Sequence, residues 1–347
     1  MSYSTFDQFQ GIWLGSIIGQ ALANKNLSEP SKIINYQPSW LAARDQIAET
    51  LLETERLEVS YLADQLAEIF KSTNNIDSQD GDWANSWEFS LIKDFNQSFL
   101  DNGIAENRSL EYSSKILAML PLIIFYGSDQ NLFTEVINQC NLKLANSQEN
   151  TDYIEDILSW GYLLTLAINN RLSSDTNVSL IVRQILTGAR VKQTSLTAKL
   201  NIVAEAWEQG ISLYQLRELL PKDHIRSTVI ALSVYCFATT PQDFRLSIKR
   251  AASLEPQLAW LTTALTGTVS GAYNGIAGIP RNWRAMANHN LTYQSANQTI
   301  VKLFQAWLGI YSVDSKQFLY NPEVHAVAPP KIIQPRSALR IISQKLF

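Results

Sequence analysis

Residues 263–280 read TALTGTVSGAYNGIAGIP, and this stretch decides the fold. Gly267, Gly271 and Gly275 recur at every fourth position, and several of the residues between them are small as well. Small residues four apart lie on one face of a helix, where they let another backbone approach closely. The spacing therefore predicts a helix that packs tightly inside an all-helical protein.

The beginning of the chain repeats the pattern. Residues 11–22 read GIWLGSIIGQAL, and their three glycines are again four positions apart. Both stretches resemble helices of the ADP-ribosylglycohydrolase family. The family's opening helix reads roughly G-x-x-x-G-x-x-x-G-D-A-L-G, and a later helix reads A-x-x-G-x-x-x-G-A-x-x-G-x-x-x-I-P-x-x-W. Here Trp283 supplies the last position of the second pattern.

Further matches lie between these helices in the same order as in the family. Residues 114–122, SKILAMLPL, resemble the family's G-x-x-M-R-x-x-P-L helix without its glycine and arginine. Residues 231–252 fit the helix and short link that lead to the second glycine-rich helix. The resemblance spans about residues 7–284 and implies an all-α, orthogonal multi-helix bundle of the ADP-ribosylglycohydrolase type.

The rest of the sequence independently favours a helical bundle. Apolar residues recur at helical spacing, for example Leu62, Leu66 and Ile69. Clusters of Ser, Thr, Asn, Asp and Pro separate these runs, and Thr240 to Asp243 is one predicted helix start, with Pro241 in the first turn. We expect more than about ten helices in one domain, residues 1–320, and a separate tail at 321–347.

The acids that the resemblance requires are missing. The family holds two magnesium ions with a Thr-Asp-Asp-Thr motif and with an Asp-x-Asp-Thr motif directly before the second glycine-rich helix. The matching positions here are Ser39 and Trp40, then Leu258 and Trp260, and Gln20 replaces the aspartate of the opening helix. Magnesium prefers oxygen ligands, which carboxylates normally supply. We therefore predict a vestigial cleft with no catalytic residue, no metal site and no cofactor.

Two fates of this cleft remain open. Trp40 and Trp260 either fill it or stack on the ring of a nucleotide-like ligand. Arg44, Asp45 and Lys115 are the candidate ligand contacts. Phosphate recognition normally uses several basic residues, and Arg44 and Lys115 are the only ones near the aligned motifs. We therefore favour filling of the cleft.

The tail differs in composition from the bundle. No acid follows Glu323, and beyond this residue four basic residues stand among many apolar ones and three prolines. Either the tail lies as an apolar strap on its own bundle, which we favour, or it docks on a protein partner or an anionic surface. The candidate tail contacts are Lys331, Arg336, Arg340 and Lys345.

Composition excludes several other classes of protein. The net charge is −4, which gives no general attraction to nucleic acid. The N-terminus lacks the features of a signal peptide, and the longest apolar run, residues 116–126, is too short to span a membrane. Cys140 and Cys236 are expected to be free thiols of a reducing compartment, and we predict a cytoplasmic protein.

The prediction is thus a catalytically inactive ADP-ribosylglycohydrolase-like protein with a binding, scaffolding or regulatory role. One alternative is an active magnesium-dependent ADP-ribosyl hydrolase with displaced ligands, for which Asp45, Glu49 and Glu255 are the candidates. A second alternative is a structural assembly factor whose bundle only presents the tail.

Overall fold

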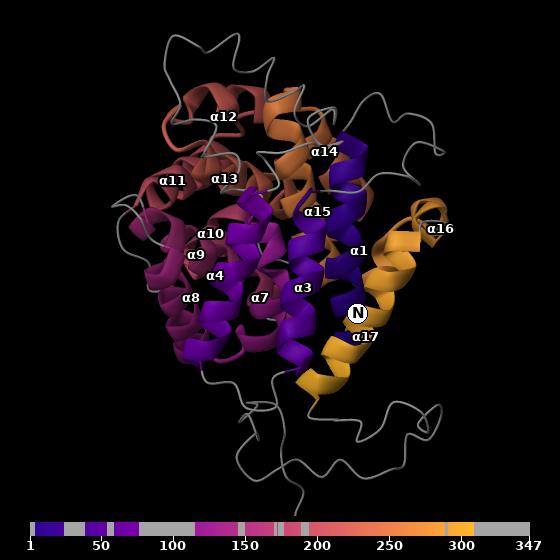
Figure 1. Ribbon diagram of the computed structural model, residues 1–347. Helices are drawn as coiled ribbons and strands as arrows, with labels where there is room; N and C mark the ends of the chain where they lie inside the picture. The colour runs from indigo at the N-terminus through magenta and orange to yellow at the C-terminus, as the bar shows by residue number, and fades with distance from the viewer. Residues whose placement is uncertain are drawn as a thin grey trace, which may run out of the picture.

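The computed structural model describes residues 4–23, 39–53, 59–75, 115–144, 150–169, 172, 177–188, 194–288 and 291–308. Within these ranges the regular secondary structure is helical, which confirms the all-α prediction (Figure 1). The helices are α1 (Thr5–Ala23), α3 (Ser39–Glu53), α4 (Val59–Asn75), α7 (Leu120–Tyr126), α8 (Gln130–Leu144), α9 (Asn150–Ile168), α10 (Val178–Gly188), α11 (Ser195–Glu208), α12 (Leu213–Leu219), α13 (Ile225–Ala238), α14 (Phe244–Ala252), α15 (Pro256–Gly278), α16 (Arg281–Asn288) and α17 (Leu291–Trp307).

The two glycine-rich helices, α1 and α15, pack on each other backbone to backbone. A Cβ atom at Gly11 would collide with the carbonyl oxygen of Gly271, and one at Gly15 with that of Gly267. One turn further on, Gly19 lies in the same way against Thr263. The pairing shows that the helices are antiparallel and that their small residues permit the close approach.

The third glycine of the later series has a different role. Gly275 interrupts α15 with φ 60° and ψ −179°, a conformation that is essentially restricted to glycine. Beside it, the Asn274 side chain donates a hydrogen bond to the Pro241 carbonyl at 2.8 Å. Gly275 therefore bends the helix, and its backbone also lies against Gly11 of α1.

On another side, α1 faces α3 through long side chains. Trp13 and Gln20 of α1 contact Arg44 and Trp40 of α3, and all four side chains are buried. Helix α17 completes this side, where Phe304 packs edge-on against Phe9 with the ring centres 5.3 Å apart. One helix thus uses two kinds of packing, glycine to backbone and bulky side chain to bulky side chain.

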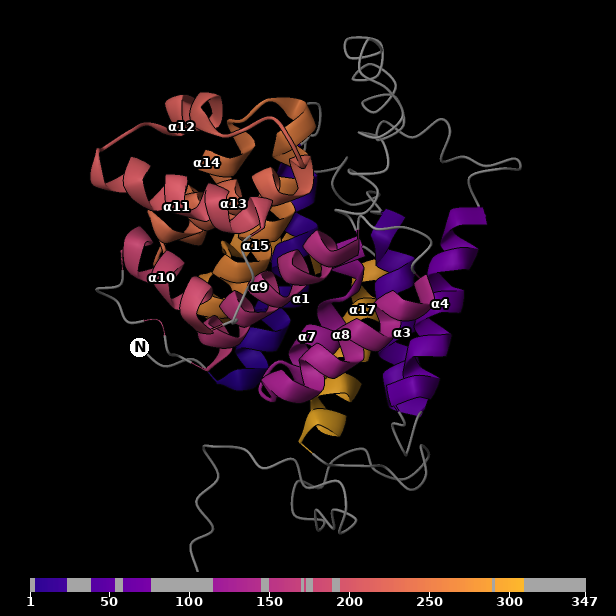
Figure 2. The same cartoon turned by 90° about the vertical axis from the view of Figure 1, so that its left-hand side faces the viewer.

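The remaining helices surround this centre. Helices α9, α13 and α14 contact α15, while α4 pairs with α8 and α10 with α11. Figures 1 and 2 both place α12 at one end of the molecule and the last turn of α17 at the opposite end. In Figure 1, α1 and α3 run upright, whereas α12 runs across the top.

One predicted helix start is wrong. Asp243 is the N-cap of α14 and accepts a hydrogen bond from the Leu246 amide at 2.9 Å, so the helix begins at Phe244. Pro241 lies in the preceding turn and is not in the first turn of the helix. The carboxylate of Asp243 decides the boundary, because its side chain satisfies an amide that the helix leaves free.

The matched stretch at 114–122 is also divided. Residues 115–118 are helical, Met119 forms a turn, and α7 begins at Leu120 with Pro121 in its first turn. Proline fits there because a first-turn amide needs no partner within the helix.

In the described part of the chain, no helix is both long and apolar enough to cross a membrane. The tail and its four candidate contacts lie outside the described residues.

Candidate functional site

The predicted cleft residues lie where three helix ends meet. Gln20 is near the end of α1, Trp40 is in the first turn of α3, and Trp260 is near the beginning of α15. The Trp40 Nε1 atom donates a hydrogen bond to Gln20 Oε1 at 2.5 Å, and both side chains are buried. Two positions that match motif aspartates of the resemblance are thus joined directly to each other.

Arg44 lies one turn along α3 and fills the space behind this pair. Its guanidinium carbon is 3.8 Å from the centre of the Trp13 ring and 5.3 Å from that of Trp40. Its Nη1 donates to the Trp13 carbonyl at 3.4 Å, and its Nε donates to Asp45 Oδ1 at 3.1 Å. The side chain is completely buried. The group formed by Gln20, Trp40, Arg44, Asp45 and Trp13 is called the Arg44 cluster below.

Burial shifts both charged groups of the Arg44 cluster toward their neutral forms. It lowers the pKa of Arg44 to about 10, against the opposing attraction of Asp45. It raises the pKa of Asp45, whose carboxylate Arg44 stabilises in return. Arg44 still carries its charge at neutral pH, because a pKa of about 10 is well above 7.

The other predicted residues lie near this corner or away from it. Leu258 is buried, and Trp260 is partly buried and packs against the core one turn before Ala264, which lies next to Gly19. Ser39 begins α3, and its side chain is not among those that the structure describes. Lys115 is half-buried in the segment that precedes α7.

Four of the predicted site residues form one connected group. Gln20 bonds to Trp40, the Trp40 ring lies next to Arg44, and Arg44 pairs with Asp45. The structure therefore brings together the vestigial position on α1 and three predicted residues of α3.

The acids proposed as displaced ligands are engaged elsewhere or exposed. Asp45 pairs with Arg44, and Glu255 pairs with Arg217 Nη2 of α12 at 2.6 Å. Glu49 is exposed on α3. Across the described ranges, no three His, Cys, Asp or Glu side chains lie close enough together to hold a metal ion. That no metal binds stays a prediction.

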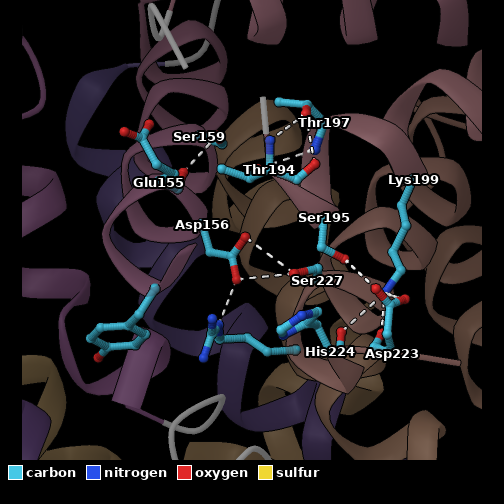
Figure 3. A network of polar contacts seen from close by, with 12 residues as sticks. Glu155, Asp156, Ser159, Thr194, Ser195, Thr197, Lys199, Asp223, His224 and Ser227 are labelled. Carbon is cyan, nitrogen blue, oxygen red and sulfur yellow. Dashed lines mark hydrogen bonds and ion pairs between the residues drawn. The ribbon is translucent and has the colours of Figure 1, made fainter. Parts of the chain in front are cut away.

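A second group of charged residues, which sequence reasoning missed, lies between α9 and α13 (Figure 3). Arg226 Nε donates to Asp156 Oδ2 at 2.5 Å, and the Ser227 hydroxyl donates to the same carboxylate at 3.2 Å. Asp156 is fully buried, and Arg226 also lies over the Tyr153 ring at 5.2 Å. Burial raises the pKa of Asp156, although Arg226 opposes the shift.

Lys199 of α11 extends this group toward the surface. Its buried Nζ donates to the carbonyls of Asp223 and His224 and pairs with Asp223 Oδ1 at 3.1 Å (Figure 3). His224 is exposed and has a left-handed backbone, with φ 46°. Burial lowers the pKa of Lys199, against the opposing interactions with Asp223. This lysine ties the link between α12 and α13 to the bundle.

The sequence contains a signal for both buried charges. Asp156 stands three residues after Tyr153 and four before Trp160, and both of these aromatic side chains face the core. Lys199 has the same relation to Leu196 and Val203. A charged residue at a core position of a helical pattern predicts a buried ion pair, since an unpaired charge is too costly to bury.

The described residues thus define an all-helical protein built on a central antiparallel helix pair, with the Arg44 cluster at one end of α1. A sequence model of the ADP-ribosylglycohydrolase family matches residues 1–310. The chain therefore belongs to the ADP-ribosylglycohydrolase family. No curated relative matches the chain.

Proposed function

We propose that this chain is a catalytically inactive member of its family with a binding, scaffolding or regulatory role. The observation that carries the proposal is the hydrogen bond between Trp40 and Gln20. Both positions match motif aspartates of the resemblance, and here their side chains are joined by a hydrogen bond inside the core. An indole and an amide also lack the negative charge that a magnesium centre requires.

The charge of the corner supports the same conclusion. Mg²⁺ is stabilised by carboxylate oxygens, whereas Gln20, Trp40, Leu258 and Trp260 supply none. Next to Trp40, Arg44 is paired with Asp45, so the one acid of the Arg44 cluster is already neutralised by a guanidinium. The residues present do not fit a dinuclear magnesium site.

Packing argues that the cleft is filled rather than open to a nucleotide ring. Trp40 is 3% exposed, and the face of Trp13 is covered by the guanidinium of Arg44. We therefore assign the binding role to the surface of the helical domain, residues 1–320, and to the tail at 321–347. A cytoplasmic location is part of this proposal.

Calorimetric titration of Mg²⁺ and of ADP-ribose into the full-length protein tests the proposal, with the melting temperature followed in parallel. A ligand that binds only the native state must raise its apparent stability. We expect no saturable heat from either ligand and no rise in melting temperature. Magnesium-dependent binding of ADP-ribose would overturn the proposal of an inactive site.

If magnesium does bind, three variants identify its ligands. If magnesium binds through displaced ligands, Asp45→Asn or Glu255→Gln must weaken it, whereas Glu135→Gln on the distant helix α8 must not. Hydrolysis of an ADP-ribosylated protein by the wild type, lost in Asp45→Asn, would establish the active enzyme instead.

A further inference from the structure

The two most exposed large apolar side chains among the described residues both lie on helix α12. Tyr214 is 72% exposed and Leu219 is 54% exposed, and Trp207 at the end of α11 is 36% exposed. By helical geometry Tyr214 and Glu218 are adjacent, and so are Gln215 and Leu219. The four residues Tyr214, Gln215, Glu218 and Leu219 are called the α12 outer face.

The opposite side of α12 is used by the fold. Leu216 and Leu220 are buried, and Ser212 caps the helix by accepting a hydrogen bond from the Gln215 amide. The adjacent Tyr235 hydroxyl donates to the Ile211 carbonyl at 2.7 Å, which fixes the link before the helix. Of the α12 outer face, only Gln215 serves the helix itself, because its side chain accepts hydrogen bonds from Ser212, whereas Tyr214 and Leu219 are not needed to hold the helix in place.

Acidic residues flank the α12 outer face. Glu205 and Glu208 are exposed on the last turns of α11, directly before α12 in the chain. At the other end, Arg217 is shared between Glu218 at one nitrogen and Glu255 at the other, so its charge is already balanced. The surface thus combines apolar contact area with an excess of negative charge.

The end of the chain has the complementary composition. The net charge of the whole chain is −4, and residues 324–347 contain four basic residues and no acid, so residues 1–323 carry −8. Read as a helix from Ser337, the tail would place Leu339, Ile342 and Leu346 in one stripe. Arg340 and Lys345 would then flank the stripe on its two sides.

We propose that residues 329–347 bind the α12 outer face of the same molecule, with the apolar stripe on Tyr214 and Leu219 and the basic residues toward the flanking glutamates. The described part of the chain ends just after α17, and the last turn of α17 lies at the end of the molecule opposite to α12 (Figures 1 and 2). Residues 309–336, which precede the apolar stripe, can span up to about 92 Å when extended. A compact domain of about 300 residues is about 50 Å across, so the path over its surface between opposite ends is about 80 Å and the stripe can reach α12.

Binding in trans tests the contact directly. A labelled peptide of residues 329–347 is titrated into the protein truncated after Ala328, and fluorescence anisotropy reports binding. We expect saturable binding that weakens with added salt, because exposed charges are screened. The double variant Tyr214→Ser/Leu219→Ser should weaken it at least about tenfold, as expected for the central side chains of an interface.

Two matched controls isolate the surface. Tyr61→Ser changes a tyrosine of comparable exposure, 50%, on the distant helix α4 and should leave binding unchanged. Glu218→Lys should weaken binding, whereas Glu135→Lys on α8 should not. Absence of peptide binding, or equal binding to the double variant and the wild type, would overturn the proposal.

Hydrogen exchange in the full chain tests whether the contact forms within one molecule. The amides of α12 should exchange more slowly in the full-length protein than in the protein truncated after Ala328, to the same extent at all protein concentrations. Protection that grows with protein concentration would assign the tail to a second copy and overturn the intramolecular arrangement. Protection that is identical in both proteins would overturn the contact itself.

Discussion

The guanidinium of Arg44 lies over Trp13 with its central carbon 3.8 Å from the ring centre, in a space from which water is excluded. An arginine held against an indole contributes cation–π attraction as well as packing. Its Nε donates to Asp45 and its Nη1 donates to the Trp13 carbonyl. Where α1 and α3 meet, the Arg44 side chain therefore occupies the space between the helices and also supplies a buried positive charge, which Asp45 balances.

Replacing Arg44 by alanine should lower the free energy of unfolding by about 3–5 kcal/mol, because it leaves a cavity and removes the partner of Asp45. Arg44→Met, which keeps most of the volume, should cost less. Urea denaturation measures both. Arg245→Ala on the exposed side of α14 is the control and should stay within about 0.5 kcal/mol of the wild type. Equal effects at the two positions would contradict the buried location of Arg44.

The glycine contact between α1 and α15 gives a second prediction. A methyl group at Gly15 must displace the carbonyl of Gly267, so Gly15→Ala and Gly267→Ala should each destabilise the protein by about 3 kcal/mol or more. Gly210→Ala separates steric contact from backbone strain: Gly210 has φ 66°, but no atom lies within 4 Å of the point that a Cβ would occupy. It should cost only about 1 kcal/mol. Thermal unfolding of the three variants shows whether Gly15→Ala and Gly267→Ala destabilise the protein more than Gly210→Ala does.

The sequence predicted the glycine contacts only in part, for a physical reason. Spacing alone identified helices that permit close approach, and the family resemblance identified their order. Neither could pair Gly11 with Gly271 or Gly15 with Gly267, since pairing depends on contacts between residues about 250 positions apart. Nor did spacing reveal that Gly275 bends the helix, because its backbone angles follow from the tertiary contacts around it.

The candidate site was predicted by position rather than by chemistry. The resemblance placed Gln20 and Trp40 at one corner, and the structure joins them by a hydrogen bond. Arg44 was considered only as a ligand contact, whereas it is completely buried. A sequence shows that a basic residue is near a motif, but only the packing of Trp13 and Asp45 around it shows that its charge is taken up inside the core.

The buried pair of Asp156 and Arg226 predicts strong coupling between two helices. Arg226→Met should destabilise the protein by about 3–5 kcal/mol, because it leaves the Asp156 carboxylate buried without its guanidinium. The double variant Asp156→Leu/Arg226→Met removes both charges and should be more stable than Arg226→Met alone. A double-mutant cycle by urea denaturation measures the coupling. Additive effects would contradict a direct ion pair between α9 and α13.

Cys236 gives a prediction with a defined pH range. It is a free, fully buried thiol on α13, and burial raises its pKa to about 12, compared with 9.0 for an exposed thiol. Between these values the unfolded chain has lost the proton that the folded protein still holds. Stability from this group is therefore complete below about pH 9 and is lost as the pH rises toward 12, by up to about 1.4 kcal/mol per pH unit.

The comparison is made in a Cys140→Ser background, so that Cys236 is the only thiol. Urea denaturation at about pH 9 and about pH 10.5 should show a loss of stability that is larger by roughly 1–2 kcal/mol than in the matching Cys236→Ala variant. Other groups that titrate in this range, such as tyrosines and lysines, contribute equally to both proteins and cancel. An identical loss of unfolding free energy in the two proteins would mean that Cys236 ionises in the folded protein as easily as in the unfolded chain. The thiol would then not be buried on α13.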